Sequence, residues 1–562
     1  MPSIRRGISE LPGLCHALGV KYAIISPGSR NAPLTLAFTG FKETTCFSIT
    51  DERSAGYYAL GLAQQLQQPV ALICTSGTAM VNYAPALAEA YYLKVPLVAI
   101  TADRPAEWID QNDGQTIRQN GLYANFIKEY TEVPVETEKE EDLWLFRRKV
   151  SEILIAATTL PWGPVHINVP LREPLYEPLP EVTTPPAAIT SLPGKPILSP
   201  TDISSLKHQW QASGKRLILC GMRSAEDYEL SGLMESLIRN NQAVIINENL
   251  SNLKIKGSID TPDSFIAFLN DEEKEELQPG LLITLGGPVV SKRLKKYLRT
   301  YKPVNHWHVG TEERLTDTFQ SLNRTIGMEP VDFFSNLLTE HPLENPYPQR
   351  IMKIHHNLKK IHERFMDNVS FTDLSAYKTI LDQLPQNSNL HLANSTPVRY
   401  SQLFPTHNQV NYFSNRGTSG IDGCVSTAAG AAWASPKPNI ALVGDLAFIY
   451  DSNALWNNKL PDNLRIIVID NEGGNIFRLI DTSPVINPIR HFFETPHQVK
   501  MDKLCEAFGV AYNKAENESE LEEILKNFFK PYARPAVLHI RTAGDVSAKT
   551  FKQYYQYISQ NK

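Results

Sequence analysis

The stretch NIALVGDLAFIYDSNALWNNKLPDNLRIIVIDNEGGNIF, residues 439–477, contains two apolar runs that each stop at polar residues. The first run ends at Gly444 and Asp445, and the second ends at Asn471. Continuous runs rich in Val, Ile and Leu predict strands of a parallel sheet covered on both faces. Because open α/β sheets bind ligands outside the carboxyl ends of their strands, we expect Asp445 and Asn471 to lie at a ligand site.

The residue types at these strand ends suit a divalent cation. The carboxylate of Asp445, the amide carbonyl of Asn471 and the backbone carbonyl of Gly473 form a hard oxygen set that suits Mg²⁺ shared with phosphate groups. Gly444 allows a diphosphate to approach the backbone, and a helix beginning near Leu446 directs free N–H groups at it. The alternative interpretation of Gly444-Asp445 alone is an N-cap Asp and a turn Asn.

The rest of the chain repeats this alternation of apolar runs and helical stretches. Proline-rich segments at 173–200 and 342–348 interrupt it and predict extended linkers. We therefore predict an α/β protein of three doubly wound parallel-sheet domains, over residues 1–180, 195–345 and 370–562. The predicted strands are YAIIS (22–26), CFSIT (46–50), VALIC (70–74), LVAIT (97–101), VHINV (165–169), RLILCG (216–221), AVIIN (243–247), LLITLGG (281–287), VNHWHV (304–309), NLHLAN (389–394), NIALVGD (439–445), LRIIVIDN (464–471) and AVLHIRT (536–542).

Composition excludes several classes of protein. The 562 residues are 42% hydrophobic and 20% charged, a balance typical of a globular protein rather than a disordered or fibrous one. No apolar run is long enough for a membrane span, and the N-terminus has no secretory pattern, so we expect a cytoplasmic location. The net charge of -5 argues against a nucleic-acid partner. Six scattered cysteines without metal-ligand spacing predict reduced thiols.

The spacing of Asp445 and Asn471, followed by Gly473 and Gly474, resembles the G-D-x(about 26)-N motif of thiamine diphosphate (ThDP) enzymes. The resemblance implies ThDP and Mg²⁺ as cofactors, with Mn²⁺ as an alternative ion. It also implies that the third domain binds the diphosphate and the metal, and that the first binds the pyrimidine ring. Ile421, in SGIDG, would be an apolar wedge against the cofactor, or else a packing residue.

A ThDP enzyme also needs a carboxylic acid against the aminopyrimidine ring. Glu52 follows the predicted strand CFSIT and opens a helix, where the family's acid lies. Its hydrogen bond to the ring would favour the imino tautomer that activates the cofactor. The alternative is that Asp51 and Glu52 only cap the helix and complement its dipole.

Arginines at predicted strand ends narrow the choice of substrate. Arginine is suited to bidentate recognition of carboxylates, so several arginines at ligand-bearing ends predict substrates with more than one carboxylate. Each of them, taken singly, also fits a surface salt bridge. The residues in question are Arg30 beside Gly28 and Ser29, Arg104 followed by Gln115 and Arg118, and Arg399 beside Ser395, together with Arg416.

Six strings are similar to those of the 2-succinyl-5-enolpyruvyl-6-hydroxy-3-cyclohexene-1-carboxylate (SEPHCHC) synthase family of menaquinone biosynthesis. The match covers the first and third domains, and Asn31 and Glu472 depart from the expected pattern. The strings are SPGSRNAPLT (26–35), TDERSAGYYALGLA (50–63), TSGTAMVNYAPALAEA (75–90), ITADRPAEWID (100–110), SNRGTSGIDG (414–423) and VGDLAFIYDSNAL (443–455).

This resemblance implies decarboxylation of 2-oxoglutarate and conjugate addition of the remaining carbanion to isochorismate, both dicarboxylates. It would place Ser395, Arg399 and Arg416 on the first substrate. The set implied for isochorismate is Arg30, Arg104, Gln115 and Lys292, with Ser29 and Arg293 nearby. Ile476 and Phe477, after the metal loop, would supply an apolar wall that excludes water, or else belong to the ordinary core. Lys292 and Arg293 fit a solvated basic helix face equally well.

Two alternatives stay open at this point, namely another ThDP-dependent 2-oxo acid decarboxylase or carboligase, and a non-catalytic protein with the same fold. The intact Glu52, Asp445 and Asn471 argue against the second. Since the family's cofactor site usually combines two subunits, we expect a homodimer or a dimer of dimers. We also expect His355, His356 and His362 to be solvated on an amphipathic helix around 352–365.

Overall fold

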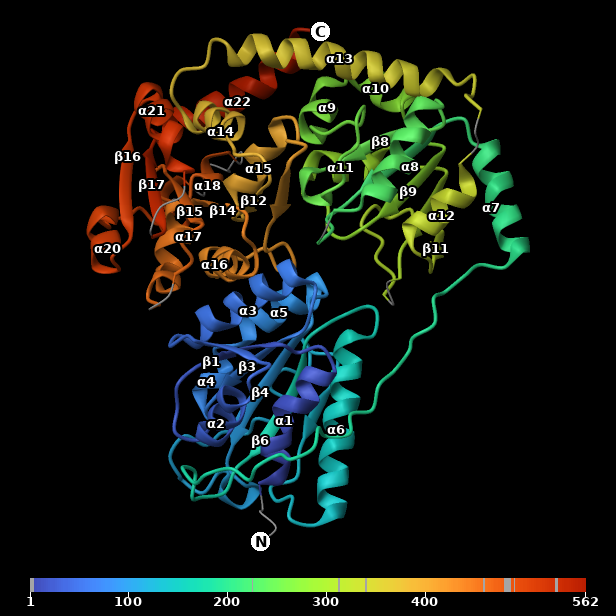
Figure 1. Cartoon of the computed structure of the whole chain (residues 1–562). Helices are drawn as coiled ribbons and strands as arrows, with labels where there is room; N and C mark the ends of the chain where they lie inside the picture. The colour runs from blue at the N-terminus through green and yellow to red at the C-terminus, as the bar shows by residue number, and fades with distance from the viewer. Residues whose placement is uncertain are drawn as a thin grey trace. The chain divides into compact units, whose positions relative to one another are not determined.

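The structure is a computed structural model that describes residues 5–224, 226–311, 314–338, 341–457, 460–479, 487–489, 491–530 and 534–562 (Figure 1). Its contacts divide the chain into two compact units. The first comprises Met1–Gly194, Asn415–Asn439 and Ala447–Leu464, and the second comprises Lys195–Ser414, Ile440–Leu446 and Arg465–Lys562.

The first unit contains a six-stranded sheet with the order β2-β1-β3-β4-β6-β5, in which neighbouring strands are parallel. Its central strands are wholly buried because helices cover both faces (Figure 1). The elements are α1 (Arg6–Ala17), β1 (Tyr22–Ile25), α2 (Ala32–Gly40), β2 (Thr45–Ser48), α3 (Glu52–Leu66), β3 (Val70–Cys74), α4 (Thr78–Val81), α5 (Ala84–Leu93), β4 (Leu97–Asp103), η1 (Ala106–Trp108), β5 (Tyr130–Glu132), α6 (Glu140–Thr158), β6 (Val165–Pro170), α16 (Cys424–Ala434) and η4 (Ser452–Leu455).

Within this unit, α3 packs directly on α16 through glycines. A Cβ atom at Gly61 would lie 1.9 Å from the carbonyl oxygen of Thr427, and one at Gly430 would lie 2.0 Å from that of Tyr58. Only glycine therefore lets the two helix backbones approach this closely. Because α3 begins at Glu52, this packing fixes the helix that carries the predicted cofactor acid.

The second unit contains two more parallel sheets, of orders β11-β10-β9-β7-β8 and β13-β12-β14-β15-β17-β16. Its first sheet and associated helices are α7 (Pro200–Ala212), β7 (Arg216–Cys220), α8 (Tyr228–Arg239), β8 (Val244–Asn247), η2 (Asn249–Ser251), α9 (Pro262–Phe268), α10 (Asp271–Glu276), β9 (Leu281–Leu285), α11 (Lys292–Thr300), β10 (Asn305–Val309), β11 (Arg324–Ile326), α12 (Pro330–Leu337) and α13 (Pro346–Met366).

The third sheet contains the two strands of residues 439–477, the stretch predicted to form the ligand site. Its elements are α14 (Asp373–Asp382), β12 (Ser388–Leu392), α15 (Thr396–Tyr400), η3 (Ser401–Leu403), β13 (Val410–Phe413), β14 (Asn439–Gly444), α17 (Asp445–Tyr450), β15 (Leu464–Asp470), α18 (Ile476–Leu479), η5 (Asn487–Ile489), α19 (His491–Glu494), α20 (Met501–Ala507), β16 (Ala511–Ala515), α21 (Glu518–Phe528), β17 (Ala536–Arg541) and α22 (Gly544–Gln560). The predicted fold class, three parallel α/β sheets, is confirmed.

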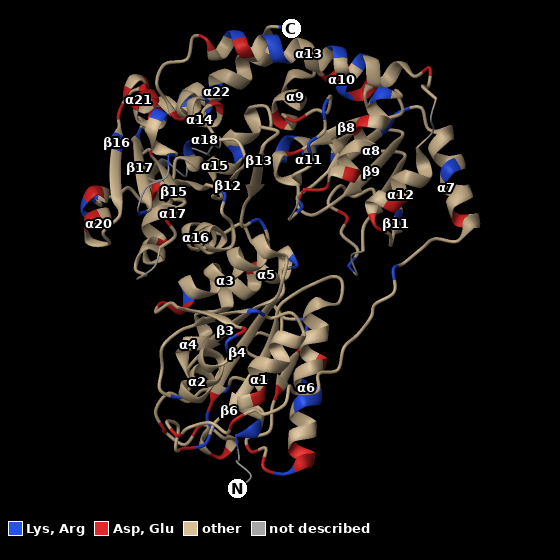
Figure 2. Ribbon diagram, in the orientation of Figure 1, with Lys and Arg blue, Asp and Glu red and all other residues tan. Residues whose placement is uncertain are grey.

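The cysteine and linker predictions agree with the structure. All six cysteines are free thiols, and residues 173–199 contain neither helix nor strand. Pro346 and Pro348, however, lie in the first turn of α13, where a missing N–H costs nothing. Among the described residues no helix could span a membrane. Figure 2 shows residues of both charge signs spread over the elements of each unit.

The prediction for two of the α13 histidines is wrong. His355 is fully buried with its ring edge-on to Phe265, and His362 hydrogen-bonds the Tyr554 hydroxyl at 2.9 Å. Burial lowers the pKa of His355 to about 3 and that of His362 to about 4, so both rings stay neutral. His356 is exposed, as predicted. The buried face of α13 includes histidine because aromatic side chains of α9 and α22 face it.

Candidate functional site

Asp445 lies at the end of β14, next to the end of β15, because the two strands are neighbours in the sheet. Its side chain is 3% exposed. The N–H of Leu446 donates to Oδ1 at 2.8 Å, and the N–H of Gly473 donates to Oδ2 at 2.7 Å. The loop after β15 is thereby tied to the residue that follows β14, which brings two of the predicted metal ligands together.

Asn471 and Gly473 complete the predicted oxygen set. Asn471 is buried, and its amide nitrogen donates to a carboxylate oxygen of Asp373 at 2.9 Å, so the amide oxygen is the remaining ligand atom. Gly473 has φ +129°, and a Cβ atom there would lie 2.3 Å from the carbonyl oxygen of Glu494. Glycine is therefore required at this turn.

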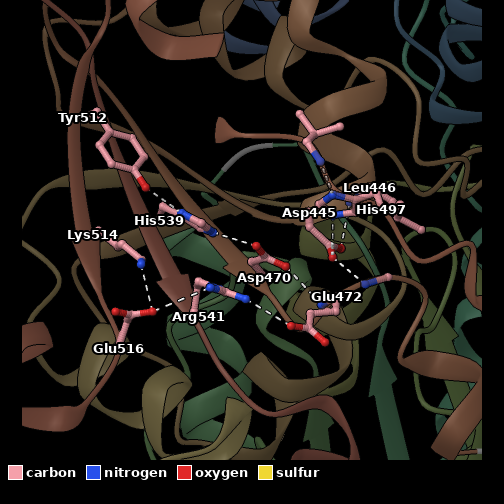
Figure 3. Close-up of polar contacts among 12 residues, drawn as sticks. Asp445, Leu446, Asp470, Glu472, His497, Tyr512, Lys514, Glu516, His539 and Arg541 are labelled. Carbon is pink, nitrogen blue, oxygen red and sulfur yellow. Dashed lines mark hydrogen bonds and ion pairs between the residues drawn. The ribbon is translucent and has the colours of Figure 1, made fainter. Parts of the chain in front are cut away.

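Two further side chains, which were not predicted from the sequence, lie close to Asp445. Asp445, Asp470 and His497 each offer a ligand atom within 4.8 Å of the others (Figure 3). His497 Nε2 lies 3.2 Å from Asp445 Oδ2, and His539 Nε2 donates to Asp470 Oδ2 at 2.8 Å. The adjacency of Asp470 to Asn471 was a usable signal, whereas His497 comes from an irregular segment that no periodicity marks.

The electrostatics of this cluster favour a cation. Burial, together with the nearby charge of Asp470, raises the pKa of Asp445 to about 7. Burial opposes ionisation of Asp470 as well, but the hydrogen bond from His539 lowers its pKa. In the described parts of the chain, neither Lys nor Arg pairs with Asp445. A buried carboxylate without a Lys or Arg partner, beside amide and backbone oxygens, fits a divalent metal ion.

Glu472, the unexpected acid of the loop, is directed to a different partner. It has φ +66°, is exposed, and accepts from Arg541 at 3.0 Å. Arg541 in turn lies 3.8 Å from Glu516, which pairs with Lys514 at 2.8 Å (Figure 3). The negative charge of Glu472 is thus compensated by Arg541, the last residue of β17.

Glu52 is the first residue of α3, and Asp51 is the N-cap, with its carboxylate accepting from the N–H of Ser54 at 3.0 Å. Capping is therefore the task of Asp51. The side chain of Glu52 makes no hydrogen bond or ion pair with another described residue. Partial burial raises the pKa of its carboxyl, so this environment shifts the equilibrium towards the protonated form.

Arg30 and Arg104 line one cavity of about 370 Å³ in the first unit. Arg30 donates to the carbonyl oxygen of Leu171 at 3.0 Å and lies 3.1 Å from Glu173, while Arg104 lies 2.7 Å from Asp113 and 3.8 Å from Glu173. The other lining residues are Pro105, Trp108 and Arg172. Two cationic groups that follow different strands thus line the same cavity.

Several other predicted residues of the first unit lie in the loops that carry Arg30 and Arg104. A Cβ atom at Gly28 would lie 2.3 Å from Cβ of Thr75, which explains the glycine, and Ser29 is exposed. Asn31, the departure from the family pattern, is buried and donates to the carbonyl oxygen of Ser26 at 2.9 Å, closing the loop. Gln115 is exposed with φ +58°. Arg118 pairs with Asp110 at 2.7 Å and does not line the cavity.

The remaining predicted residues lie in several elements. Arg399 and Ser395 share one turn of α15, where the guanidinium donates to the Ser395 carbonyl oxygen at 2.6 Å. Lys292 and Arg293 begin α11 and are exposed, with Arg293 4.0 Å from the ring centre of Tyr555. The half-buried residues are Arg416, Ile421, Gly444, Leu446, Gly474, Ile476 and Phe477.

Comparison with known proteins adds the family. Residues 9–122 match "Thiamine pyrophosphate enzyme, N-terminal TPP binding domain", residues 242–392 match "Middle domain of thiamine pyrophosphate", and residues 395–540 match "Thiamine pyrophosphate enzyme, C-terminal TPP binding domain". A 2-succinyl-5-enolpyruvyl-6-hydroxy-3-cyclohexene-1-carboxylate synthase of Flavobacterium johnsoniae is 40% identical over 552 residues, covering 97% of each chain. The chain belongs to this synthase family. The predicted resemblance is confirmed.

Other relatives agree with this assignment. The synthase of the same name from Porphyromonas gingivalis is 38% identical over 567 residues, covering 99% of this chain and 98% of the relative. Among solved structures, benzoylformate decarboxylase from Polynucleobacter necessarius superposes with a TM-score of 0.72 at 15% identity, covering 97% of this chain and 99% of that one. At that identity the superposition shows a shared fold only.

Proposed function

We propose that this chain catalyses the decarboxylation of 2-oxoglutarate and the conjugate addition of its remaining four-carbon unit to isochorismate, giving SEPHCHC in menaquinone biosynthesis. The observation that carries the proposal is the cavity lined by Arg30, Arg104 and Arg172, a cluster of arginines suited to carboxylates, within a synthase-family chain. Decarboxylation of pyruvate alone would not require such a cavity.

Bound ThDP would supply the nucleophilic carbon, and the protein would supply binding, orientation and protons. Asp445, Asn471 and the carbonyl of Gly473 would hold Mg²⁺, or Mn²⁺ in its place, against the diphosphate beside Gly444, Leu446 and Gly474. Glu52 would hold a proton at the aminopyrimidine ring, as its raised pKa favours. Ile421 would support the cofactor, and Gly28 would allow its close approach.

The two dicarboxylates would bind to different arginines. Ser395, Arg399 and Arg416 would bind the 2-oxoglutarate carboxylate, and burial of Arg399 supports this role because a desolvated guanidinium binds an anion more strongly. The isochorismate site would comprise Arg30, Arg104, Gln115, Ser29, Lys292 and Arg293, with Ile476 and Phe477 excluding water.

The assembly and the domain limits belong to the same proposal. We propose a homodimer or a dimer of dimers whose subunits complete each other's cofactor sites, with domains at 1–180, 195–345 and 370–562. Sedimentation velocity of the active protein tests the assembly, and a fully active monomer would contradict it.

The reaction is tested by following the absorbance of isochorismate with 2-oxoglutarate, ThDP and Mg²⁺ present. We expect isochorismate to disappear only when all components are present. Pyruvate in place of 2-oxoglutarate is the matched control. Equal turnover with pyruvate, or carbon dioxide release from 2-oxoglutarate without loss of isochorismate, would indicate a different ThDP enzyme.

A further inference from the structure

Asp373 is a fully buried carboxylate, 0% exposed, at the start of α14. Its Oδ1 accepts from the hydroxyls of Thr542 at 2.5 Å and Ser547 at 3.1 Å. Its Oδ2 accepts from the amide nitrogens of Asn471 at 2.9 Å and Asn475 at 3.4 Å. The two oxygens therefore have different partners. Oδ1 binds the segment that follows β17, and Oδ2 binds the loop that carries the predicted metal ligands after β15.

The chemistry of a carboxylate fixes which way these amides point. An ionised carboxylate only accepts hydrogen bonds, whereas a primary amide has a donating –NH₂ end and an accepting oxygen end. Asn471 and Asn475 must therefore turn their –NH₂ groups to Asp373 and their oxygens away from it. Asn475 is 3% exposed, and its Oδ1 is a buried acceptor without a hydrogen-bond partner in the described part of the chain. A buried acceptor of this kind calls for an explanation.

We infer that Asp373 is a positioning residue of the metal site, which fixes the amide oxygens of Asn471 and Asn475 so that they face the divalent cation and its bound water. The inference rests on the proposed metal role of Asn471. Without Asp373, rotation of the Asn471 amide by half a turn would present –NH₂ to the cation in place of oxygen. Groups that orient a metal ligand in this way change metal affinity by about 10- to 100-fold when they are removed.

Asp373 is 98 residues away from Asn471 in the sequence and outside the family's metal motif. Its position follows from the fold, because α14 brings it to the segments that follow β15 and β17. These segments come from neighbouring strands, since β15 pairs with β17. The same carboxylate thus ties α14 to both strand ends.

The test compares D373L with T542V. Asp373→Leu has a similar shape but no hydrogen-bonding atom, so it no longer holds either amide, whereas an asparagine would keep one oxygen that could still accept from both. Thr542→Val removes a hydrogen bond to the other oxygen of the same carboxylate and is the matched control for lost stability. Mn²⁺ binding to the ThDP-loaded protein is measured by electron paramagnetic resonance, and Mg²⁺ binding by calorimetry, with melting temperature as the check on folding.

We expect D373L to bind Mn²⁺ about 10- to 100-fold more weakly, and T542V to melt earlier while its Mn²⁺ affinity changes less than about threefold. In the exchanged pair D373N/N471D, the amide of residue 373 donates to the carboxylate of residue 471, so the pair should recover part of the affinity. A folded D373L with wild-type affinity overturns the inference, as does an equal loss of affinity in T542V.

If D373L does not fold, the exchanged pair D373N/N471D decides. A folded exchanged pair that binds Mn²⁺ no more tightly than N471A also overturns the inference. Binding is read without turnover, so its outcome is separate from the proposed reaction. A wild-type protein that binds Mn²⁺ but leaves isochorismate unchanged contradicts only the reaction, and one that turns over without any divalent cation contradicts only the positioning role.

Discussion

The guanidinium group of Arg30 lies 3.1 Å from a carboxylate oxygen of Glu173, and the two side chains are 6% and 68% exposed. The same oxygen lies 3.8 Å from Arg104, which also pairs with Asp113. Carboxylates of the protein therefore neutralise both arginines at the cavity where a substrate carboxylate is proposed to bind. An exposed carboxylate is a weak partner, since such ion pairs contribute about 0–1 kcal/mol.

Glu173→Gln should therefore lower the KM for isochorismate by about two- to fivefold, because about 1 kcal/mol of competition is removed. Steady-state kinetics measure this, with quenching of Trp108 fluorescence on anion binding as an independent signal. Glu181→Gln, an exposed glutamate on the same extended segment, is the control and should leave KM unchanged. A raised KM in the Glu173 variant would instead make this carboxylate part of the binding site.

Glu52→Gln should abolish isochorismate consumption and leave ThDP binding within about threefold of wild type. The reason is that an amide cannot exchange the proton that the carboxyl holds, while Asp51 still caps α3. Calorimetric titration with ThDP measures binding, and the absorbance assay measures turnover. Full activity in this variant would exclude Glu52 as the cofactor acid.

Gly61→Ala should destabilise the first unit by about 3 kcal/mol or more, because the new methyl group would overlap the carbonyl oxygen of Thr427. Gly40→Ala is the matched control, since a Cβ atom there meets nothing within 4 Å. Thermal melting followed by circular dichroism compares the two variants. Equal melting temperatures for the two variants would mean that α3 and α16 move apart to accommodate the methyl group without loss of stability.

Glu248 makes stability depend on pH. Its carboxylate accepts from the N–H groups of Val290 and Ser291 at 2.7 and 2.8 Å, but burial raises its pKa to about 7. A pKa raised on folding contributes stability that is complete below the unfolded value, about 4.3, and that is lost as pH rises through about 7.

Between pH 5 and pH 8, the unfolding free energy of the wild type should therefore fall by roughly 2 kcal/mol more than that of Glu248→Gln, since each pKa unit corresponds to about 1.4 kcal/mol. Urea unfolding at four pH values measures this, with Glu272→Gln as an exposed control on α10. Parallel pH curves for the Glu248 variant and wild type would show that Glu248 does not titrate in this range.

All thirteen predicted strands are present in the structure, and the four that were missed are β5, β11, β13 and β16. Each of the four lies at the edge of its sheet. Edge strands have neighbours on one side only, so a short, partly polar segment such as Tyr130–Glu132 pairs there without a continuous apolar run. The cytoplasmic location, the domain limits and the homodimer stay predictions.

The sequence by itself determined the fold class, the family and the chemistry at the ends of β14 and β15, because apolar runs and the spacing of Asp445 and Asn471 are local properties of the chain. Only the tertiary structure revealed that Asp373 and His497 face these groups, and that Glu173 lies beside Arg30 and Arg104. Their partners lie tens to hundreds of residues away, and no local pattern encodes such a distance, since it depends on how helices and loops pack around each sheet. The burial of His355 was hidden for the same reason.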